Sequence, residues 1–305
     1  MIEREFLVFQ ETKADSRVTI LIPNYNHGEF LEESIHSALA QDTSDIEVLV
    51  ADDGSTDQSR EILQSFGDQV TARLFEHQGV YTIRQACLQE IRTPYFLNLD
   101  ADNRLRPDAV RQLRTALEEA DSEVAFAYGQ REVFGSREPV RSQFPAFSVE
   151  RLREKNYLDM GALVRTEAAQ QVGFDAQFND GMGDYDFFLS LVERGYRGVL
   201  VDELVCDYRS HGGSLTGRAF VTGLKLRTWK RLLRKHRLFF GEERADEHWR
   251  HVVAKTRHFL QRSPGRPLSR EEKWLRTWNL LRLEWYRPDR LVHGGKLIWQ
   301  APRKS

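Results

Sequence analysis

The sequence predicts an α/β protein with a mostly parallel sheet flanked by helices and a helical C-terminal extension. Three observations predict it. Short β-branched runs alternate with helical patterns over the first part of the chain, which is typical of βαβ units. Polar motifs follow directly after several of these runs. After residue 217 the pattern becomes helical, basic and rich in tryptophan.

The first predicted strands and helices alternate in chain order. The strands cover residues 18–22, 45–51, 71–75 and 95–99, and the helices cover 29–40, 58–66, 82–90 and 107–120. In parallel sheets, ligands bind beyond the carboxyl ends of the strands. The polar motifs at these strand ends are therefore the first candidates for a functional site.

The rest of the chain is less regular. The run VAFAYGQREVF (124–134) predicts a further strand, and apolar residues at helical spacing predict a helix over 184–195. From Arg218 onward the pattern is helical, and the SPGRP segment (263–267) divides this tail into two parts.

The charge distribution also divides the chain. Residues 1–217 hold 21 Lys+Arg and 38 Asp+Glu, whereas residues 218–305 hold 23 and 8. We therefore expect a catalytic and ligand-binding domain over 1–217 and a basic extension over 218–305, facing different partners.

Composition excludes several classes of protein. The chain is 40% hydrophobic and 30% charged, as soluble globular proteins are. We see neither an apolar run of the roughly 18 residues that a membrane span needs nor a secretory signal. Its two cysteines, Cys87 and Cys206, give no disulfide framework and no zinc spacing, which suits a reducing cytoplasm.

The pair Asp100 and Asp102 carries the strongest chemical signal. Two carboxylates spaced i, i+2 after a buried strand can bind one divalent ion, and hard oxygen ligands suit Mg²⁺ or Mn²⁺. Such an ion stabilises a departing diphosphate as a Lewis acid. The alternative is an acidic turn that caps the helix beginning near Pro107.

Several further motifs stand in order with this pair. TILIPNYNHGEFLEESIHSALAQ, VLVADDGSTDQS and YFLNLDADN are followed by GFDAQFNDGMGDYDFFLSLVERGYRGVLVDELVCDYRSHGGSLT. Together they span roughly residues 17–217 and resemble the inverting family 2 glycosyltransferases of GT-A (Rossmann-like) fold. The resemblance implies transfer of a sugar from a nucleotide diphosphate donor, most often a UDP sugar, to an acceptor hydroxyl, with Mn²⁺ or Mg²⁺ as cofactor.

The resemblance also implies which residues bind the donor. Pro23, Tyr25 and Asn26 match a motif that lies against the base and ribose, although Asn26 also suits a plain Pro-Asn turn. Asp53 matches the pyrimidine contact, more closely than its neighbour Asp52 does. Arg84 matches an arginine near the donor, with a solvated helix arginine as the alternative.

The same comparison implies a metal site. Asp102 corresponds to the direct metal ligand, and Asp100 to a contact with the ribose or with the metal's surroundings. His211 corresponds to a histidine that completes the metal site or touches the diphosphate. Relatives often carry another acid after this motif, where Asn103 stands here.

Asp184 is the expected catalytic base. An inverting transfer needs one carboxylate to deprotonate the acceptor hydroxyl, and Asp184 stands where relatives carry that acid. Its alternative role is a helix N-cap. We expect Asp186 to be an ordinary first-turn acid of the same helix, and Gly161 to belong to an acceptor-side segment.

The expected function is thus an inverting, metal-dependent sugar transfer, in cell-surface polysaccharide or glycolipid synthesis, to a saccharide or lipid-linked acceptor. A non-catalytic sugar-nucleotide-binding module or scaffold is the alternative. A nucleotidyltransferase would carry a Gly-rich, Arg/Lys-bearing loop after its first strand, and IPNYNHGEF is not one.

The basic tail suggests where the protein acts. Residues 218–240 combine cations with Leu224, Trp229, Leu232, Leu233 and Phe239–Phe240. Such a helix can lie on an anionic membrane surface, which would make the protein cytoplasmic and peripheral on the inner face of the membrane. The alternative is a packed helix with a solvated basic face. Nucleic acid is not expected as a partner, because no recognition motif accompanies the charge.

Overall fold

A computed structural model describes residues 18–136, 138–211 and 225–261, together with positions 270, 273, 274 and 277. The chain divides into two units, Met1–Thr216 and Gly217–Ser305, each described by itself. Leu224, the break at 263–267 and the tryptophans at 278, 285 and 299 lie outside the described residues.

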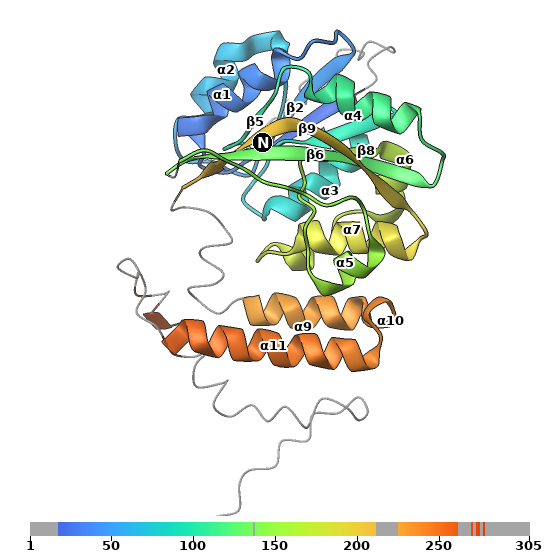
Figure 1. The fold of residues 1–305 in the computed structure, drawn as a ribbon. Coiled ribbons are helices and arrows are strands. Elements are labelled where there is room, and N and C mark those ends of the chain that lie inside the picture. The colour runs from blue at the N-terminus through green and yellow to red at the C-terminus, as the bar shows by residue number, and fades with distance from the viewer. Residues whose placement is uncertain are drawn as a thin grey trace, which may run out of the picture. The chain divides into compact units, whose positions relative to one another are not determined.

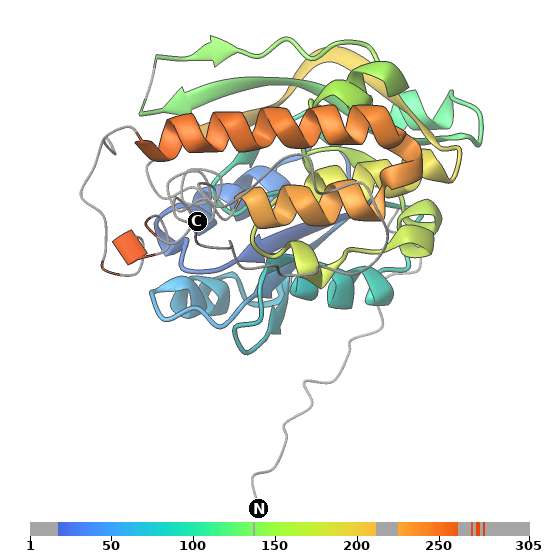
Figure 2. The ribbon, with the colours of Figure 1, turned by 90° about the horizontal axis from the view of Figure 1, so that it is seen from below.

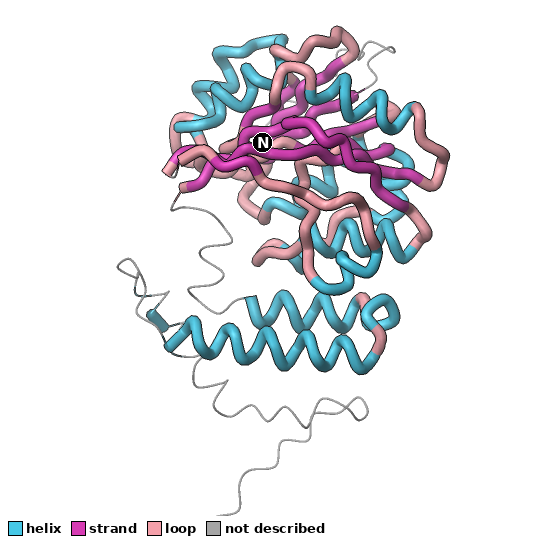
Figure 3. Tube along the Cα trace, in the orientation of Figure 1, coloured by secondary structure: helices cyan, strands magenta, loops and turns pink. Residues whose placement is uncertain are grey.

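The first unit is built around one mixed sheet (Figures 1 and 3). Its strands are β1 (Val18–Asn24), β2 (Ile46–Asp52), β3 (Thr71–Leu74), β4 (Tyr95–Asn98), β5 (Arg104–Leu105), β6 (Val124–Gly135), β7 (Val140–Arg141), β8 (Leu163–Arg165) and β9 (Arg197–Ser210). Within the described residues the strand order is β3-β2-β1-β4-β8-β6-β9-β5, with β7 paired to β6.

Helices cover both faces of this sheet. They are α1 (Gly28–Leu39), α2 (Ser59–Phe66), α3 (Val80–Glu90), α4 (Ala109–Glu118), α5 (Val149–Glu154), α6 (Thr166–Val172) and α7 (Gly183–Glu193), with 3₁₀ turns at Gly67–Gln69 and Ala176–Phe178. Figure 1 shows α1, α2 and α4 on one face and α3, α5 and α7 on the other. The predicted α/β fold class is confirmed.

The core explains why the first strands formed as predicted. β1 is buried along its whole length, as expected for a central parallel strand covered on both faces. It pairs in parallel with β2 on one side and β4 on the other. In α1, the residues Leu31, Ile35 and Ala38 are fully buried at helical spacing. These ladders align the carboxyl ends of β1, β2 and β4 at one edge of the sheet.

The second half of the sheet differs from the prediction in two ways. β8 runs antiparallel to both β4 and β6, so the sheet is mixed. The strands β5, β7, β8 and β9 were not predicted, and the longest of them, β9, runs parallel to β6. Register shifts near Gly129 and Gln130 interrupt the β6–β9 ladder, and such bulges break the period-2 pattern by which a strand is recognised in sequence.

The described part of the second unit is helical. It contains α9 (Lys225–Lys235), α10 (Arg237–Phe240) and α11 (Glu242–Gln261), and α9 and α11 lie side by side (Figure 2). Leu232, Leu233, Phe239 and Phe240 are buried, and Trp229 stacks with His248. Most of the apolar residues proposed for a membrane face are thus packed. No described helix is long and apolar enough to cross a bilayer.

Candidate active site

The turn after β1 carries three of the predicted donor-binding residues. Pro23 is buried in β1, and the Tyr25 side chain is 41% exposed and stacks on His77, with ring centroids 4.0 Å apart. Asn26 has a left-handed backbone (φ 54°) and accepts a hydrogen bond from Thr56 N at 2.7 Å. Asn26 therefore forms the turn that was the alternative to donor binding at this position. The Tyr25 ring remains partly exposed to solvent.

The DDGSTD turn after β2 is held by its own carboxylates. Asp53 is buried, and its two oxygens accept hydrogen bonds from Gln78 N (2.8 Å) and Gly79 N (2.9 Å). Asp53 therefore fixes the loop that precedes α3, and His77 lies 2.9 Å from the same carboxylate. A pyrimidine contact from Asp53 stays a prediction.

Its neighbour Asp52 is fully buried. The Asp52 carboxylate accepts hydrogen bonds from Asn24 Nδ2 and Ser55 N, which ties the end of β1 to the turn after β2. Gly54 has φ 75°, and a Cβ there would lie 2.7 Å from His77 N, so the turn requires glycine at this position.

Arg84 and Asp100 form an ion pair at the end of β4. The guanidinium is 4% exposed, and its Nη2 donates to Asp100 Oδ1 at 2.6 Å. It also lies over the ring of Tyr81, 5.0 Å from the centroid. The alternative of a solvated helix arginine is therefore wrong. Loss of solvent raises the pKa of Asp100, Arg84 opposes that rise, and Asp102 adds to it.

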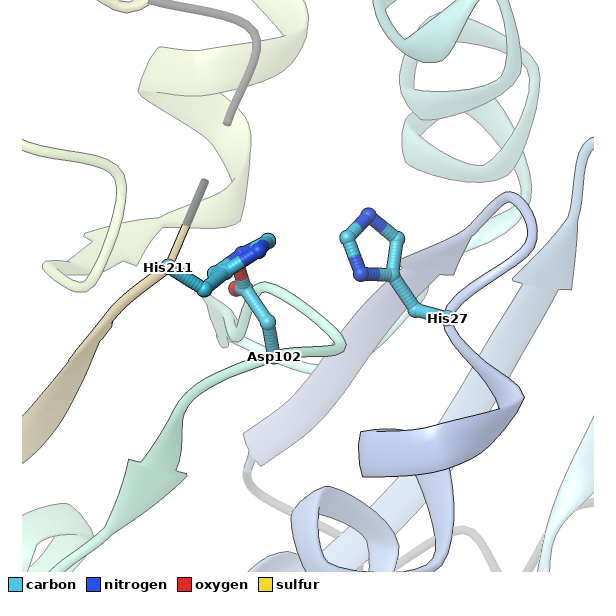
Figure 4. Close-up of side chains that lie close together, drawn as sticks. All are labelled: His27, Asp102 and His211. Atoms are coloured by element: carbon cyan, nitrogen blue, oxygen red, sulfur yellow. The ribbon is translucent and has the colours of Figure 1, made fainter. Parts of the chain in front are cut away.

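Asp102 and His211 meet, as predicted for a metal site. His211 Nε2 lies 2.8 Å from Asp102 Oδ2, although 109 positions separate the two residues. Figure 4 shows both side chains together with His27, which the sequence interpretation did not single out. The acidic turn does not cap the next helix, because α4 begins at Ala109 with Asp108 as its N-cap.

Asn103 explains how β9 reaches this turn. Its Oδ1 accepts a hydrogen bond from Arg209 N at 2.9 Å, and Arg209 Nε donates to the carbonyl of Asp102. These bonds fasten the segment just before His211 to the DAD turn. An acid in place of Asn103 could accept the same bond, so this position serves as an anchor with either residue.

The pair fits a divalent cation. Adjacent ligands of an octahedral Mg²⁺ or Mn²⁺ lie about 3 Å apart when each bond is about 2.1 Å long. The 2.8 Å between Asp102 Oδ2 and His211 Nε2 agrees with that separation. Both side chains are one-fifth exposed, which leaves room for oxygen ligands from another molecule.

Asp184 lies in the first turn of α7, where Met182 is the N-cap residue. Its Oδ1 accepts from Tyr185 N (2.8 Å), and its Oδ2 accepts from Asn156 Nδ2 (3.0 Å). The simple N-cap alternative is therefore wrong. Burial raises the pKa of Asp184 to about 6, with the Tyr185 amide opposing the rise. A carboxyl group with that pKa is ionised near neutral pH and can still accept a proton.

Tyr81 connects this carboxylate to the Arg84–Asp100 pair. The Tyr81 hydroxyl accepts a hydrogen bond from Asp184 N at 3.0 Å, and its ring lies beneath the Arg84 guanidinium. A Cβ on Gly183 would lie 2.4 Å from the Tyr81 ring, so glycine at the start of α7 allows this close approach. Tyr81 therefore contacts both the backbone of Asp184 and the guanidinium that pairs with Asp100.

The remaining expectations have mixed outcomes. Asp186 is an acid of the first turn of α7, as expected, and it is buried. Gly161 N donates to Asp159 Oδ1 at 2.9 Å, and the acceptor-side role of Gly161 stays a prediction. His27, Tyr81 and Asn156 were missed, because each acquires its place through contacts distant in sequence.

Comparison with known proteins identifies the family. The model for "Glycosyl transferase family 2" matches residues 19–173, which is just over half of the chain. The chain belongs to this family. Among its relatives by sequence is the putative teichuronic acid biosynthesis glycosyltransferase TuaG of Bacillus subtilis, 25% identical over 222 residues, covering 70% of this chain and 85% of TuaG.

Other relatives match over shorter segments. An uncharacterised glycosyltransferase of Rickettsia prowazekii is 31% identical over 111 residues, covering 36% of this chain. The match spans 35% of that protein, so this chain corresponds to about a third of its length.

Solved structures confirm the GT-A fold. S. aureus TarS 1-349 in complex with UDP-GlcNAc superposes with TM-score 0.58 and 16% identity, covering 88% of this chain and 90% of that one. Mannosyltransferase PcManGT from Pyrobaculum calidifontis, in complex with GDP-Man and Mn²⁺, gives TM-score 0.56 and 17% identity, covering 90% and 82%.

Proposed function

We propose that this glycosyltransferase moves a sugar, with inversion, from a nucleotide diphosphate donor to a hydroxyl of a saccharide or lipid-linked acceptor. One observation carries the proposal: Asp184, with its pKa of about 6, is linked through Tyr81 and Arg84 to the acidic turn at the sheet edge. A base and a donor-binding edge in one site are what a single displacement needs.

In this mechanism the acceptor oxygen attacks the anomeric carbon as the bond from that carbon to the diphosphate oxygen breaks. The acceptor proton passes to a carboxylate oxygen of Asp184, and the diphosphate leaves with the bonding electron pair. A divalent cation, Mn²⁺ or Mg²⁺, held by Asp102 and His211 would supply Lewis-acid stabilisation of the leaving diphosphate. Arg84 keeps Asp100 oriented at the same edge.

For the donor we propose a UDP sugar. The UDP-GlcNAc complex of TarS supports this choice. The GDP-Man complex of PcManGT is the reason to test GDP sugars as well. Tyr25 offers its exposed ring as a surface on which the base can stack. The relation to TuaG supports an acceptor in cell-surface polysaccharide synthesis.

The experiment is a screen of nucleotide sugars against the full chain with Mn²⁺, Mg²⁺ or EDTA. We expect one donor class to raise the melting temperature and to be slowly hydrolysed, because binding to the folded state stabilises it. A scaffold without catalytic function would bind a donor without hydrolysing it, alone or with added acceptors. NMR of the product anomer would then test inversion.

For the basic extension (218–305) we propose that exposed cations contact the anionic inner face of the membrane, where the acceptor would be presented. Arg227, Arg234, Lys235 and Arg237 are exposed, and Leu238 is 97% exposed beside them. Sedimentation with phosphatidylglycerol vesicles, compared with phosphatidylcholine vesicles, tests this idea. Equal recovery in both supernatants would eliminate it.

A further inference from the structure

His27 lies across from Asp102 and His211. One possible ligand atom from each of the three residues lies within 4.8 Å of the other two. The rings of His27 and His211 meet edge to face, with centroids 5.8 Å apart (Figure 4). The three residues come from separate elements: the start of α1, the turn after β4 and the end of β9. Opposite ligands of one octahedral ion lie about 4.2 Å apart, so the cluster is of the right size.

The backbone holds His27 in this position from both sides. On one side, Asn26 takes a left-handed conformation, donates its N–H to Ser55 Oγ at 2.9 Å and accepts from Thr56 N. On the other side, Gly28 N donates to Asp57 Oδ2 at 2.8 Å. The DDGSTD turn therefore fixes the backbone around His27 before any ligand binds, and a fixed backbone limits where the imidazole can lie.

The imidazole of His27 is available as a ligand. It is half-buried, and within the described residues neither of its ring nitrogens has a hydrogen-bond partner. Among the described residues, the His, Cys, Asp and Glu side chains whose possible ligand atoms group with that of His27 are Asp102 and His211. A neutral imidazole with an open nitrogen facing a carboxylate and a second imidazole is a common arrangement at transition-metal sites.

We propose that His27 is a third protein ligand of the divalent cation and that it makes the site selective for Mn²⁺ over Mg²⁺. This proposal rests on the metal site proposed for Asp102 and His211 and refines it. Mg²⁺ prefers oxygen ligands and exchanges its water reluctantly for nitrogen. Two imidazoles and one carboxylate favour Mn²⁺ and the heavier divalent ions of the first transition row.

The test is direct metal binding by the full-length chain, followed by Mn²⁺ electron paramagnetic resonance with and without UDP, and by Mg²⁺ competition. For His27→Ala we expect Mn²⁺ affinity to fall at least about tenfold, since even residues behind the direct ligands are worth that much. We expect Mg²⁺ affinity to change less than about threefold. The matched control is His36→Ala, on the same helix with a side chain 64% exposed, which should match the wild type.

Electron–nuclear double resonance of bound Mn²⁺ gives a second measurement that is independent of affinity. The wild type should show two coupled histidine nitrogens, and His27→Gln only one. Two nitrogens coupled to Mn²⁺ in His27→Gln would overturn the role of His27. Unchanged Mn²⁺ affinity in His27→Ala, together with lost binding in Asp102→Asn, would do the same. Either result leaves the Asp102–His211 site intact. An equal loss for Mn²⁺ and Mg²⁺ overturns the selectivity. No ion binding by the wild type, with or without UDP, removes both proposals.

Discussion

Arg84 Nη2 lies 2.6 Å from Asp100 Oδ1, so the first acid of the DAD turn is already paired with a buried guanidinium. This pair joins α3 to the end of β4 and lies next to Tyr81, which contacts the backbone of Asp184. Contacts of Arg84 and Tyr81 therefore link Asp100, at the carboxyl end of β4, to Asp184, the candidate base. The first prediction tests that connection.

Arg84→Lys should weaken the fold and the site together. Lysine keeps the charge but loses the planar fork that reaches Asp100 while lying over Tyr81. We expect a loss of about 1–2 kcal/mol in the free energy of unfolding, measured in urea. Arg92→Lys is the control, because Arg92 is exposed and, within the described part of the chain, donates to the nearby backbone carbonyls of Gln89 and Ile91. Equal stability of the two variants would contradict the pairing.

Asp102→Ala should abolish the metal-dependent part of donor turnover. The substitution removes the only carboxylate in the cluster with His211 and His27 among the described residues. The measurement is release of nucleoside diphosphate at several Mn²⁺ concentrations. Full activity in Asp102→Ala, with the same dependence on Mn²⁺, would refute the metal-site assignment.

Asp184→Asn should keep donor binding and lose transfer. The amide still accepts a hydrogen bond through its oxygen, so the start of α7 should keep its structure, but it cannot take a proton at neutral pH. Donor affinity by calorimetry should match the wild type within about threefold, while transfer falls at least about a hundredfold. Unchanged transfer would show that another group acts as the base.

The pH dependence of kcat/KM should follow the same carboxyl group. Burial raises the pKa of Asp184 to about 6, and the base acts only when ionised. Activity should therefore be low below pH 5, rise through about pH 6 and reach a plateau above it. A rate that is flat between pH 5 and 7.5 would contradict this role.

The local parts of the site could be predicted from sequence, whereas the distant contacts could not. Asp100 and Asp102 follow a buried strand, and strand ends are local features. Arg84 was ambiguous because its burial depends on the partner it meets, not on its own helix. His27 was missed because nothing within α1 indicates that β9 returns to the same turn with His211. β9 itself carries a bulged ladder that hides its strand pattern.

Asn156 should act as a positioning residue for Asp184. Its Nδ2 donates to Asp184 Oδ2 at 3.0 Å, and such a bond favours the ionised carboxylate. In Asn156→Ala the pKa of Asp184 should rise further, so the acid limb of the kcat/KM profile should move upward by roughly one pH unit.

Ser148→Ala is the control, since Ser148 caps α5 in the same segment. A loss of stability alone would lower activity at every pH in both variants without moving the limb. If the acid limb does not move in Asn156→Ala, Asn156 is a structural contact and does not set the pKa of Asp184. If the limb moves in Asn156→Ala and not in Ser148→Ala, the Asn156 amide positions the candidate base.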